Sequence, residues 1–313
     1  MTILATGVSG HLAPIVCDLL AEKGADVVGV DVRPLPPGRA FPGEFYTIRY
    51  TQRRIAEVFR RHKPKVLIHM GRIRGTDVQS SSYRYNQNVL GTKHLLDLCL
   101  KHDVKRVVVL STFHVYGAHQ HNPIGLKEDS PLRASQIFPQ LSDAVELDHA
   151  ATSYLWRYRR IETVVVRPCN IVGPSLNNMI SRLLRLRNVP TLLGYDPMMQ
   201  FVHERDCARA IQLAVESDKW GVFNVGGEGA VPYTAAIRLA GGRPVPIPHV
   251  VAYPLVGSLS RMRLVFPKHL MDYFRYPTVI SDESFRDTFG YAPHYDSVET
   301  LRSLRAPATV GTR

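Results

Sequence analysis

Cysteine is scarce in this sequence, and long apolar runs are missing. The 313 residues include only four cysteines, Cys17, Cys99, Cys169 and Cys207. None forms a CxxC pair and all lie in apolar patterns, so we expect reduced, buried thiols in a cytoplasmic protein, without disulfides or a zinc site. No run of 18 apolar residues occurs, which predicts no transmembrane helix. Met1 leads directly into a predicted strand, so we expect no signal peptide.

Acidic residues are fewer than basic ones. The 39 Lys and Arg against 27 Asp and Glu give a formal net charge of +12 at pH 7. Such an excess suits nucleic acid, an anionic membrane, an anionic small substrate, or a solvated surface without a partner. The basic clusters are spread over several predicted helices without a nucleic-acid-binding motif. The apolar segment Val250–Phe266 fits a core helix better than an interfacial one. We therefore expect neither nucleic acid nor a membrane as partner.

Strand and helix patterns alternate along the first half of the chain. Residues 2–6 form a short apolar run, apolar residues then recur at helical spacing, and residues 26–31 form the next run. Strand, turn, helix and strand within about 30 residues indicate a βαβ unit. Further strands are predicted at residues 65–70, 106–111 and 163–167. This alternation predicts an α/β fold, a Rossmann-like doubly wound parallel sheet.

The pattern changes after about Gly173. Proline and glycine become frequent, and short helices mix with short strands at residues 221–225 and 244–248. We interpret this part as a smaller, mixed α/β C-terminal lobe. The predicted organisation is a Rossmann-like dinucleotide-binding domain at residues 1–173 and a substrate-binding lobe at residues 174–313, with the two interleaved.

A glycine-rich turn follows the first predicted strand. Gly7, Gly10 and Ala13 form a variant of the dinucleotide fingerprint. Gly7 permits the tight turn, Gly10 lets the backbone approach a pyrophosphate, and Ala13 stands where helix and strand pack closely. The N–H groups that begin the helix would face the phosphates. The turn also contains three further expected cofactor-binding residues, Ser9, His11 and Leu12.

An acidic residue ends the second predicted strand. Asp31 lies 18 residues after Ala13. Its carboxylate can accept hydrogen bonds from an adenosine ribose and would repel a 2′-phosphate, which favours NAD over NADP. Arg33 could instead pair with a 2′-phosphate, so NADP stays the second choice. A structural turn without a ligand is the alternative.

Five segments occur in a recognisable order. They are Thr6–Ala13 with Asp31, Asn88–Thr92, Ser111–Gly117, Arg167–Pro174 and Phe201–Asp206. Together they resemble the extended short-chain dehydrogenase/reductase family, also called the NAD-dependent epimerase/dehydratase family, over nearly the whole chain. The resemblance implies a dinucleotide cofactor, a nucleotide-sugar-like ligand and a homodimer.

The resemblance also assigns roles to single positions. Thr112 matches the catalytic Ser/Thr that hydrogen-bonds the reacting carbonyl or hydroxyl. Arg167 and Pro168 begin the crossing to the substrate lobe and count among the cofactor-binding positions. Three further positions shape that lobe, namely Asn170, His203 and Asp206.

The family's acid–base pair, a Tyr with a Lys four residues later, is missing. In the family the Lys lowers the pKa of the Tyr, because a phenol with a pKa of about 10 suits neutral pH poorly. No tyrosine of this sequence has a Lys at the fourth position after it. The best alignment places Gln140 at the tyrosine and Ala144 at the lysine. Neither side chain supplies a titrating proton.

Two other places depart from the family. Arg49 or Tyr50 stands where members often have an Asp that contacts adenine. After Met70 the usual small residues are replaced by a segment with Arg72 and Arg74. Both arginines could bind phosphate or be solvated.

Substitute bases are few. Asp143 and Glu146 are possible, whereas His149 lies on roughly the opposite helix face from Gln140. Three histidines, His114, His119 and His121, cluster near a predicted loop. Their spacing matches no metal pattern, so we expect a polar surface loop and no metal.

Losing both members of the pair removes about 10²- to 10⁴-fold in rate. The sequence therefore favours an NAD(P)-binding, catalytically degenerate protein with a sensor, scaffold or repurposed role. The alternative is an active NAD-dependent oxidoreductase or nucleotide-sugar epimerase/dehydratase with an altered acid/base. A nucleic-acid or membrane-surface interaction protein is a third hypothesis.

Overall fold

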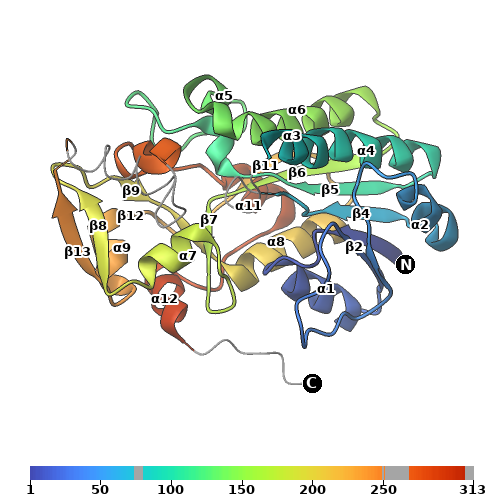
Figure 1. The fold of residues 1–313 in the computed structure, drawn as a ribbon, viewed down its shortest axis with the longest axis horizontal. Helices are drawn as coiled ribbons and strands as arrows, with labels where there is room; N and C mark the ends of the chain where they lie inside the picture. Colours follow the sequence, from blue (N-terminus) through green and yellow to red (C-terminus); the bar gives the residue numbers. More distant parts are fainter. Residues whose placement is uncertain (74–79, 249, 251–267, 307–313) are drawn as a thin grey trace.

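The apolar runs that alternate with helical patterns form one seven-stranded parallel sheet. The computed structural model describes residues 1–73, 80–248, 250 and 268–306. The strands lie in the order β3-β2-β1-β4-β5-β6-β11 (Figure 1). Their bounds are β1 Thr2–Thr6, β2 Asp26–Asp31, β3 Phe45–Thr47, β4 Val66–His69, β5 Arg106–Leu110, β6 Glu162–Pro168 and β11 Gly221–Val225. The order runs outward in both directions from β1 and β4, which confirms the predicted doubly wound α/β sheet.

Helices cover both faces of the sheet, as the chain crosses between parallel strands. One face carries α1 (Ala13–Glu22) and α8 (Glu204–Glu216), which pack against each other. The other carries α2 (Ile55–His62), α4 (Gly91–Lys101) and α6 (Ser142–Arg157) (Figure 1).

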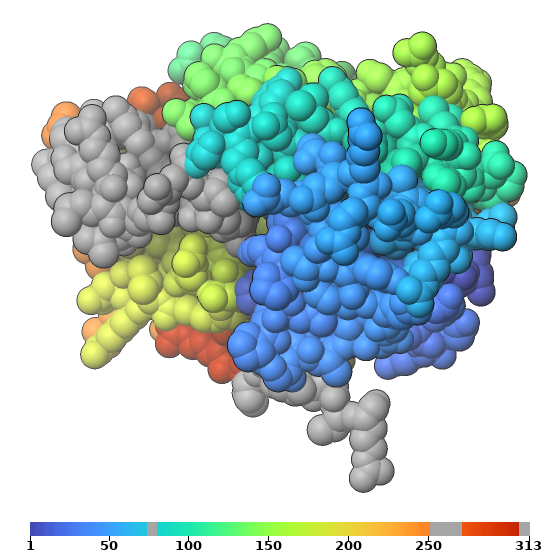
Figure 2. All heavy atoms as spheres, turned by 45° about the vertical axis from the view of Figure 1, so that its right-hand side comes forward, coloured from blue at the N-terminus to red at the C-terminus, as the bar shows by residue number. Residues whose placement is uncertain are grey.

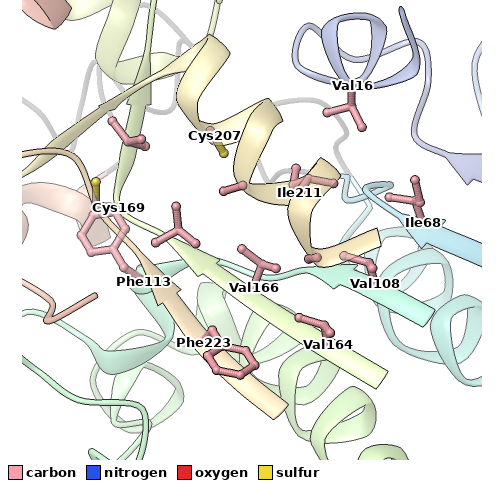
Figure 3. Packing of buried hydrophobic residues seen from close by; sticks show 14 of the residues in the cluster. Val16, Ile68, Val108, Phe113, Val164, Val166, Cys169, Cys207, Ile211 and Phe223 are labelled. Atoms are coloured by element: carbon pink, nitrogen blue, oxygen red, sulfur yellow. The ribbon is translucent and has the colours of Figure 1, made fainter. Parts of the chain in front are cut away.

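Successive residues of each central strand enter two different cores because strand side chains alternate in direction. Ile3 and Ala5 of β1 join the core that α1 and α8 cover, whereas Leu4 joins the core of α2 and α4. Figure 3 shows Cys207 and Ile211 of α8 over the β6 strand in the first core. Burying an isoleucine side chain such as that of Ile211 stabilises the fold by roughly 1.5–3 kcal/mol.

The smaller lobe consists of three two-stranded sheets. The pairs are β7 (Asn170–Val172) with β10 (Phe201–His203), β8 (Asn188–Leu192) with β13 (Arg243–Ile247), and β9 (Met198–Met199) with β12 (Val231–Pro232). The lobe also contains α7 (Met179–Leu184), α9 (Tyr233–Leu239) and α12 (Ser297–Arg302). In the space-filling view this lobe, in yellow-green, touches the blue N-terminal segments (Figure 2).

The strand predicted at residues 221–225 is confirmed, but its assignment to the smaller lobe is wrong. Gly221–Val225 pairs in parallel with β6, Gly221 opposite Val164, and so forms the edge of the main sheet. A short apolar run does not reveal its partner strand, because pairing depends on the long crossover through α8. The chain thus returns to the main sheet after Gly173, and the residue 173 boundary stays a prediction.

Shorter elements complete the fold. They are α3 (Ser81–Tyr85), the π-helix η1 (Asn86–Leu90), the 3₁₀ helices η2 (Phe113–Tyr116), η3 (Pro139–Leu141), η4 (Lys268–Phe274) and η5 (Ser303–Arg305), α5 (Ala134–Ile137) and α11 (Glu283–Phe289).

All four cysteines are buried and unbridged, as expected. Within the described part of the chain, no helix has the length and apolarity needed to cross a bilayer. Except for Val250, the apolar segment at residues 250–266 lies outside the described residues.

Candidate functional site

A cleft opens at the carboxyl ends of the central strands, where the strand order reverses. Its cavity volume is ≈ 390 Å³. The sheet contributes the turn after β1, the end of β2 and the residues that follow β4, β5 and β6, and the small lobe closes the other side. Open α/β sheets bind ligands at this position. Of the predicted site residues, those lining the cleft are Gly7, Ser9, Gly10, His11, Leu12, Asp31, Arg33, Thr112, Gln140, Ala144, Pro168 and Asn170.

The glycine-rich turn is held in a conformation that only glycine adopts easily. Gly7 has a φ of +77°, and a Cβ there would lie 2.5 Å from the Cα of Gly71. The Gly7 N–H donates to the Val30 carbonyl at 3.0 Å, and the Gly10 N–H donates to the Gly7 carbonyl at 2.9 Å. No side chain caps the N-terminus of α1, and its first turn holds no acid. The N–H groups and dipole of α1 therefore favour an anion at the cleft.

Asp31 stabilises this turn while it lines the cleft. One carboxylate oxygen accepts the Ser9 N–H and the other the Arg33 N–H, both at 2.9 Å. The Nε atom of Arg33 lies 3.8 Å from the Asp31 carboxylate, and the Arg33 side chain is 54% exposed. A carboxylate has about four acceptor positions, so Asp31 retains capacity for a ribose diol.

Arg39, Arg49 and Arg72 have different surroundings. Nη1 of Arg39, a residue that sequence reasoning missed, donates to the Gly10 carbonyl at 2.8 Å. Its signal was hidden in a proline-rich loop without regular pattern. Arg49 is exposed and its guanidinium lies 5.5 Å from the Tyr83 ring centroid. Arg72 lines the cleft, and Arg74 lies outside the described residues.

Tyr50 packs beneath the cofactor end of the cleft. Its side chain is 1% exposed, and a Cβ on Gly71 would lie 2.1 Å from its hydroxyl oxygen. Burial raises the pKa of Tyr50 well above its usual value. Tyr50 therefore stays protonated and fills the space between the turn and the segment after β4.

Thr112 and His114 meet at the end of β5. Oγ1 of Thr112 lies 2.9 Å from Nδ1 of His114 and accepts the His114 backbone N–H at 3.3 Å. Both residues line the cleft. The ring of His114 lies 4.2 Å from that of Phe113 and 4.8 Å from that of Tyr273, centroid to centroid. The cleft thus brings a hydroxyl and an imidazole together.

The expectation that His114 shares a surface loop with His119 and His121 is wrong. The helix η2 turns His114 into the cleft, whereas His119 and His121 pair with each other outside it, with ring centroids 5.2 Å apart. Sequence spacing could not separate them because η2 is only four residues long. In the described ranges, no group of three His, Cys, Asp or Glu side chains could hold a metal ion.

The two positions aligned with the family's pair both line the cleft. Gln140 lies exposed in η3, and Ala144 is buried in the first turn of α6. The Gln140 carbonyl accepts Nη2 of Arg84 at 3.3 Å. Neither side chain carries a titratable group, so no proton transfer begins at either.

The other substitute bases are engaged elsewhere. Asp143 lines the cleft, but its carboxylate lies 3.3 Å from Nε of Arg84 and accepts Nδ2 of Asn88. Glu146 accepts the Tyr85 hydroxyl at 2.7 Å and does not line the cleft. His149 is exposed on α6 and does not line the cleft either.

Arg167 faces away from the cleft into a buried network. Nε and Nη2 donate to the Asp148 carboxylate at 2.9 and 2.7 Å, and Nη1 donates to the Tyr116 hydroxyl at 2.9 Å. Asp148 also accepts the Ser111 hydroxyl. Burial raises the pKa of Tyr116 to about 12. This network ties β5, β6 and α6 together and thereby positions the strand end that carries Thr112.

His203 and Asp206 lie at the start of α8, outside the cleft lining. The Asp206 carboxylate accepts the backbone N–H groups of His294 and Tyr295, each at 3.0 Å. The His203 ring stacks on Tyr295 at 3.7 Å, and burial lowers the pKa of His203 to about 4. Both residues hold the C-terminal segment against α8. Asn170, in contrast, lines the cleft and donates to the Gln200 carbonyl at 3.0 Å.

Two curated proteins illustrate the relatives of this chain. An uncharacterized protein of Mycobacterium tuberculosis is 34% identical over 219 residues, which cover 68% of this chain and 57% of that protein. The chain therefore spans little more than half the length of this relative. The UDP-glucose 4-epimerase of Halalkalibacterium halodurans is 25% identical over 334 residues, covering 96% of this chain and 93% of the enzyme.

Solved structures share the fold. MoeE5 in complex with UDP-glucuronic acid and NAD matches with a TM-score of 0.76 and 21% identity over 97% of both chains. The Thermus thermophilus UDP-glucose 4-epimerase in complex with NAD matches with a TM-score of 0.77 and 20% identity, again over 97% of both chains.

The family itself follows from a sequence model. The model of the NAD dependent epimerase/dehydratase family matches residues 3–226, well over half of the chain. This confirms the resemblance seen in the motifs, and NAD is the cofactor of the family and of both structural neighbours. The chain belongs to the NAD-dependent epimerase/dehydratase family.

Proposed function

We propose that this protein is an NAD-dependent enzyme that acts on a nucleotide-linked sugar with an acid–base group other than the family's Tyr and Lys. The sequence alone favours a degenerate protein, because Gln140 and Ala144 stand at that pair's positions. One observation changes this preference: His114 lines the cleft, 2.9 Å from Oγ1 of Thr112. An imidazole titrates near neutral pH, which Gln140 cannot do.

The residues at the cofactor end fit a dinucleotide. The turn at Gly7 and Gly10 and the uncapped start of α1 would hold the pyrophosphate. Asp31 would hold the adenosine ribose, and its negative charge disfavours a 2′-phosphate. Arg33 is drawn toward Asp31, so NAD remains the first choice and NADP the second. The bound dinucleotide would supply a two-electron acceptor.

A nucleotide sugar as the other ligand rests on the similar proteins and on the shape of the cleft. Two of those proteins are UDP-glucose 4-epimerases, and MoeE5 was solved with UDP-glucuronic acid. In this chain the small lobe adds both polar and apolar side chains to the same cleft, Asn170 and Met179 among them. Arg72 adds a positive charge that suits a diphosphate.

The test has two stages. Calorimetric titration should detect NAD binding, and Asp31→Ala should weaken it. NADH absorbance and chromatography of the sugars should then reveal turnover of UDP-glucose, UDP-galactose or UDP-glucuronic acid. Absence of NAD binding, or of any conversion at high enzyme concentration, would contradict the proposal.

A sensor or scaffold that binds NAD without turnover is the second candidate, favoured by Gln140 and Ala144 in the cleft wall. The double variant Gln140→Tyr with Ala144→Lys separates the two. A degenerate protein would be silent as wild type and gain turnover in the double variant. An enzyme with its own base would turn over as wild type.

A homodimer and a cytoplasmic location complete the proposal. The family resemblance supports the homodimer, and the four buried, unbridged cysteines support the location. Neither nucleic acid nor a membrane surface is proposed as a partner. Light scattering on the purified chain should give twice the monomer mass of 35.2 kDa. A monomer at micromolar concentration would contradict the dimer.

A further inference from the structure

We propose that Thr112 and His114 form the proton relay of this cleft, in which the Thr112 hydroxyl passes a substrate proton to Nδ1 of His114. The inference rests on the proposed function and names the acid–base group that the function requires. Both side chains line the cleft that also contains the phosphate turn.

The hydrogen bonds around Thr112 bring its hydroxyl within reach of the His114 ring. Oγ1 of Thr112 accepts the backbone N–H of His114 at 3.3 Å while it lies 2.9 Å from Nδ1 of the same residue. For the relay, the Thr112 hydroxyl must donate its proton to Nδ1 of His114, which requires that this ring nitrogen be unprotonated. The relay therefore requires the neutral ring to carry its proton on Nε2.

The ring of His114 is held from two sides. Phe113 lies against it at 4.2 Å, and Tyr273 of η4 meets it edge-on at 4.8 Å and 61°. The Tyr273 hydroxyl also donates to the His114 carbonyl at 2.7 Å. Burial raises the pKa of Tyr273 far above neutrality, so this donor keeps its proton. Tyr273 is a positioning residue that ties the relay to the C-terminal part of the chain.

The relay accounts for the proton that is released when an alcohol is oxidised. The substrate carbon gives up a hydride, which NAD⁺ accepts, and its hydroxyl proton moves to Oγ1 of Thr112 as the Thr112 proton moves to Nδ1 of His114. The products are a carbonyl, NADH and an imidazolium. Reduction returns the proton along the same path.

The pH response depends on what faces the ring. Besides His114 itself, the charged or titratable side chains that line the cleft, within the described residues, are His11, Asp31, Arg33, Tyr50, Arg72, Asp143, Cys169 and Tyr273. Asp143 is paired with Arg84, and Tyr50, Cys169 and Tyr273 stay protonated because burial raises their pKa values. In this scheme His114 takes up the substrate proton, so oxidation requires its ring to be unprotonated.

Nitrogen-15 NMR of the histidine rings tests the relay without cofactor or turnover. The wild type should show Nδ1 of His114 unprotonated and Nε2 protonated, and Thr112→Val should shift the Nδ1 resonance. His119→Asn, outside the cleft, should leave the His114 signals unchanged. A protonated Nδ1, or an Nδ1 signal indifferent to Thr112→Val, would overturn the relay whatever the activity.

Turnover provides the second test. In His114→Asn the amide can still accept the Thr112 proton in a hydrogen bond but cannot take it up, so kcat should fall about 10²- to 10⁴-fold. NAD affinity should change less than threefold, and the acid limb of the kcat–pH profile should disappear. Retained turnover in His114→Asn would overturn the relay alone, whereas an inactive wild type would overturn the proposed function.

Discussion

The two ends of the cleft differ in how their residues are brought together. At the cofactor end, the turn at Gly7 and Gly10 and the carboxylate of Asp31 lie within one βαβ unit. At the end where we propose catalysis, His114 of η2 meets Tyr273 of η4, 159 residues away in sequence. Local motifs therefore define the first end, and long-range packing defines the second.

The largest effect is expected at the turn, and it tests whether the cofactor end depends on backbone geometry. Gly7→Ala should lower NAD affinity about 100-fold or more and destabilise the fold by several kcal/mol, because the new Cβ would lie 2.5 Å from Gly71. Gly194, with a φ of +86° and open space where a Cβ would stand, provides the control. Gly194→Ala should cost only about 1–2 kcal/mol from its backbone conformation. If calorimetry gave Gly7→Ala and Gly194→Ala the same NAD affinity, the role of Gly7 in NAD binding would be contradicted.

His69 is buried in the core, whereas His114 lines the cleft. His69 lies between Thr6 and Thr92, at 2.6 and 2.8 Å, and burial lowers its pKa from 6.5 to about 4. The unfolded chain then binds more protons than the folded one between these values, so stability falls as the pH drops from about 6.5 toward 4. This difference corresponds to about 3 kcal/mol.

Denaturant unfolding at several pH values measures this effect. His69→Gln should flatten the loss of stability between pH 6.5 and 4, while His119→Gln should leave its slope unchanged. An identical slope in wild type and His69→Gln would show that His69 does not titrate as its burial requires.

A tenfold effect is expected from Asp31, whose carboxylate we propose binds the adenosine ribose. Asp31→Asn should weaken NAD binding about tenfold and raise the affinity for NADP relative to NAD, because the repulsion of a 2′-phosphate is removed. The exposed Asp26, at the start of the same strand, provides the control. If Asp26→Asn changed the NAD to NADP ratio as much as Asp31→Asn, the assignment of Asp31 would fail.

The smallest effect is expected at Arg39. Its bond to the Gly10 carbonyl supports the turn from outside the cleft lining, so Arg39→Ala should weaken NAD binding about three- to fivefold. Arg53→Ala removes an exposed arginine and should have no effect. Calorimetry measures the NAD affinity of both variants. If Arg39→Ala and Arg53→Ala bound NAD equally well, Arg39 would have no role in supporting the turn.

The sequence predicted those features that depend on neighbours in the chain. Five contiguous apolar runs predicted five of the seven strands of the sheet and missed the short β3. The spacing from Gly7 to Asp31 predicted two residues that line one cleft, and their binding of a cofactor stays a prediction. The sequence did not place Gly221–Val225 at the sheet edge, because a run of five residues does not reveal which strand it pairs with. It also missed the direction of His114, because a four-residue 3₁₀ helix leaves no periodicity to detect. Arg167 likewise matched a family motif, but its bonds to Asp148 became visible only in three dimensions.

Turnover and NAD binding measured on the same preparations of wild type and His114→Asn test the central claim most directly. With NAD saturating and a UDP-sugar as substrate, the account predicts that His114→Asn binds NAD within threefold of the wild type and loses at least 100-fold in kcat. Turnover within threefold of the wild type, at unchanged NAD affinity, would contradict the claim that the catalytic end works through His114.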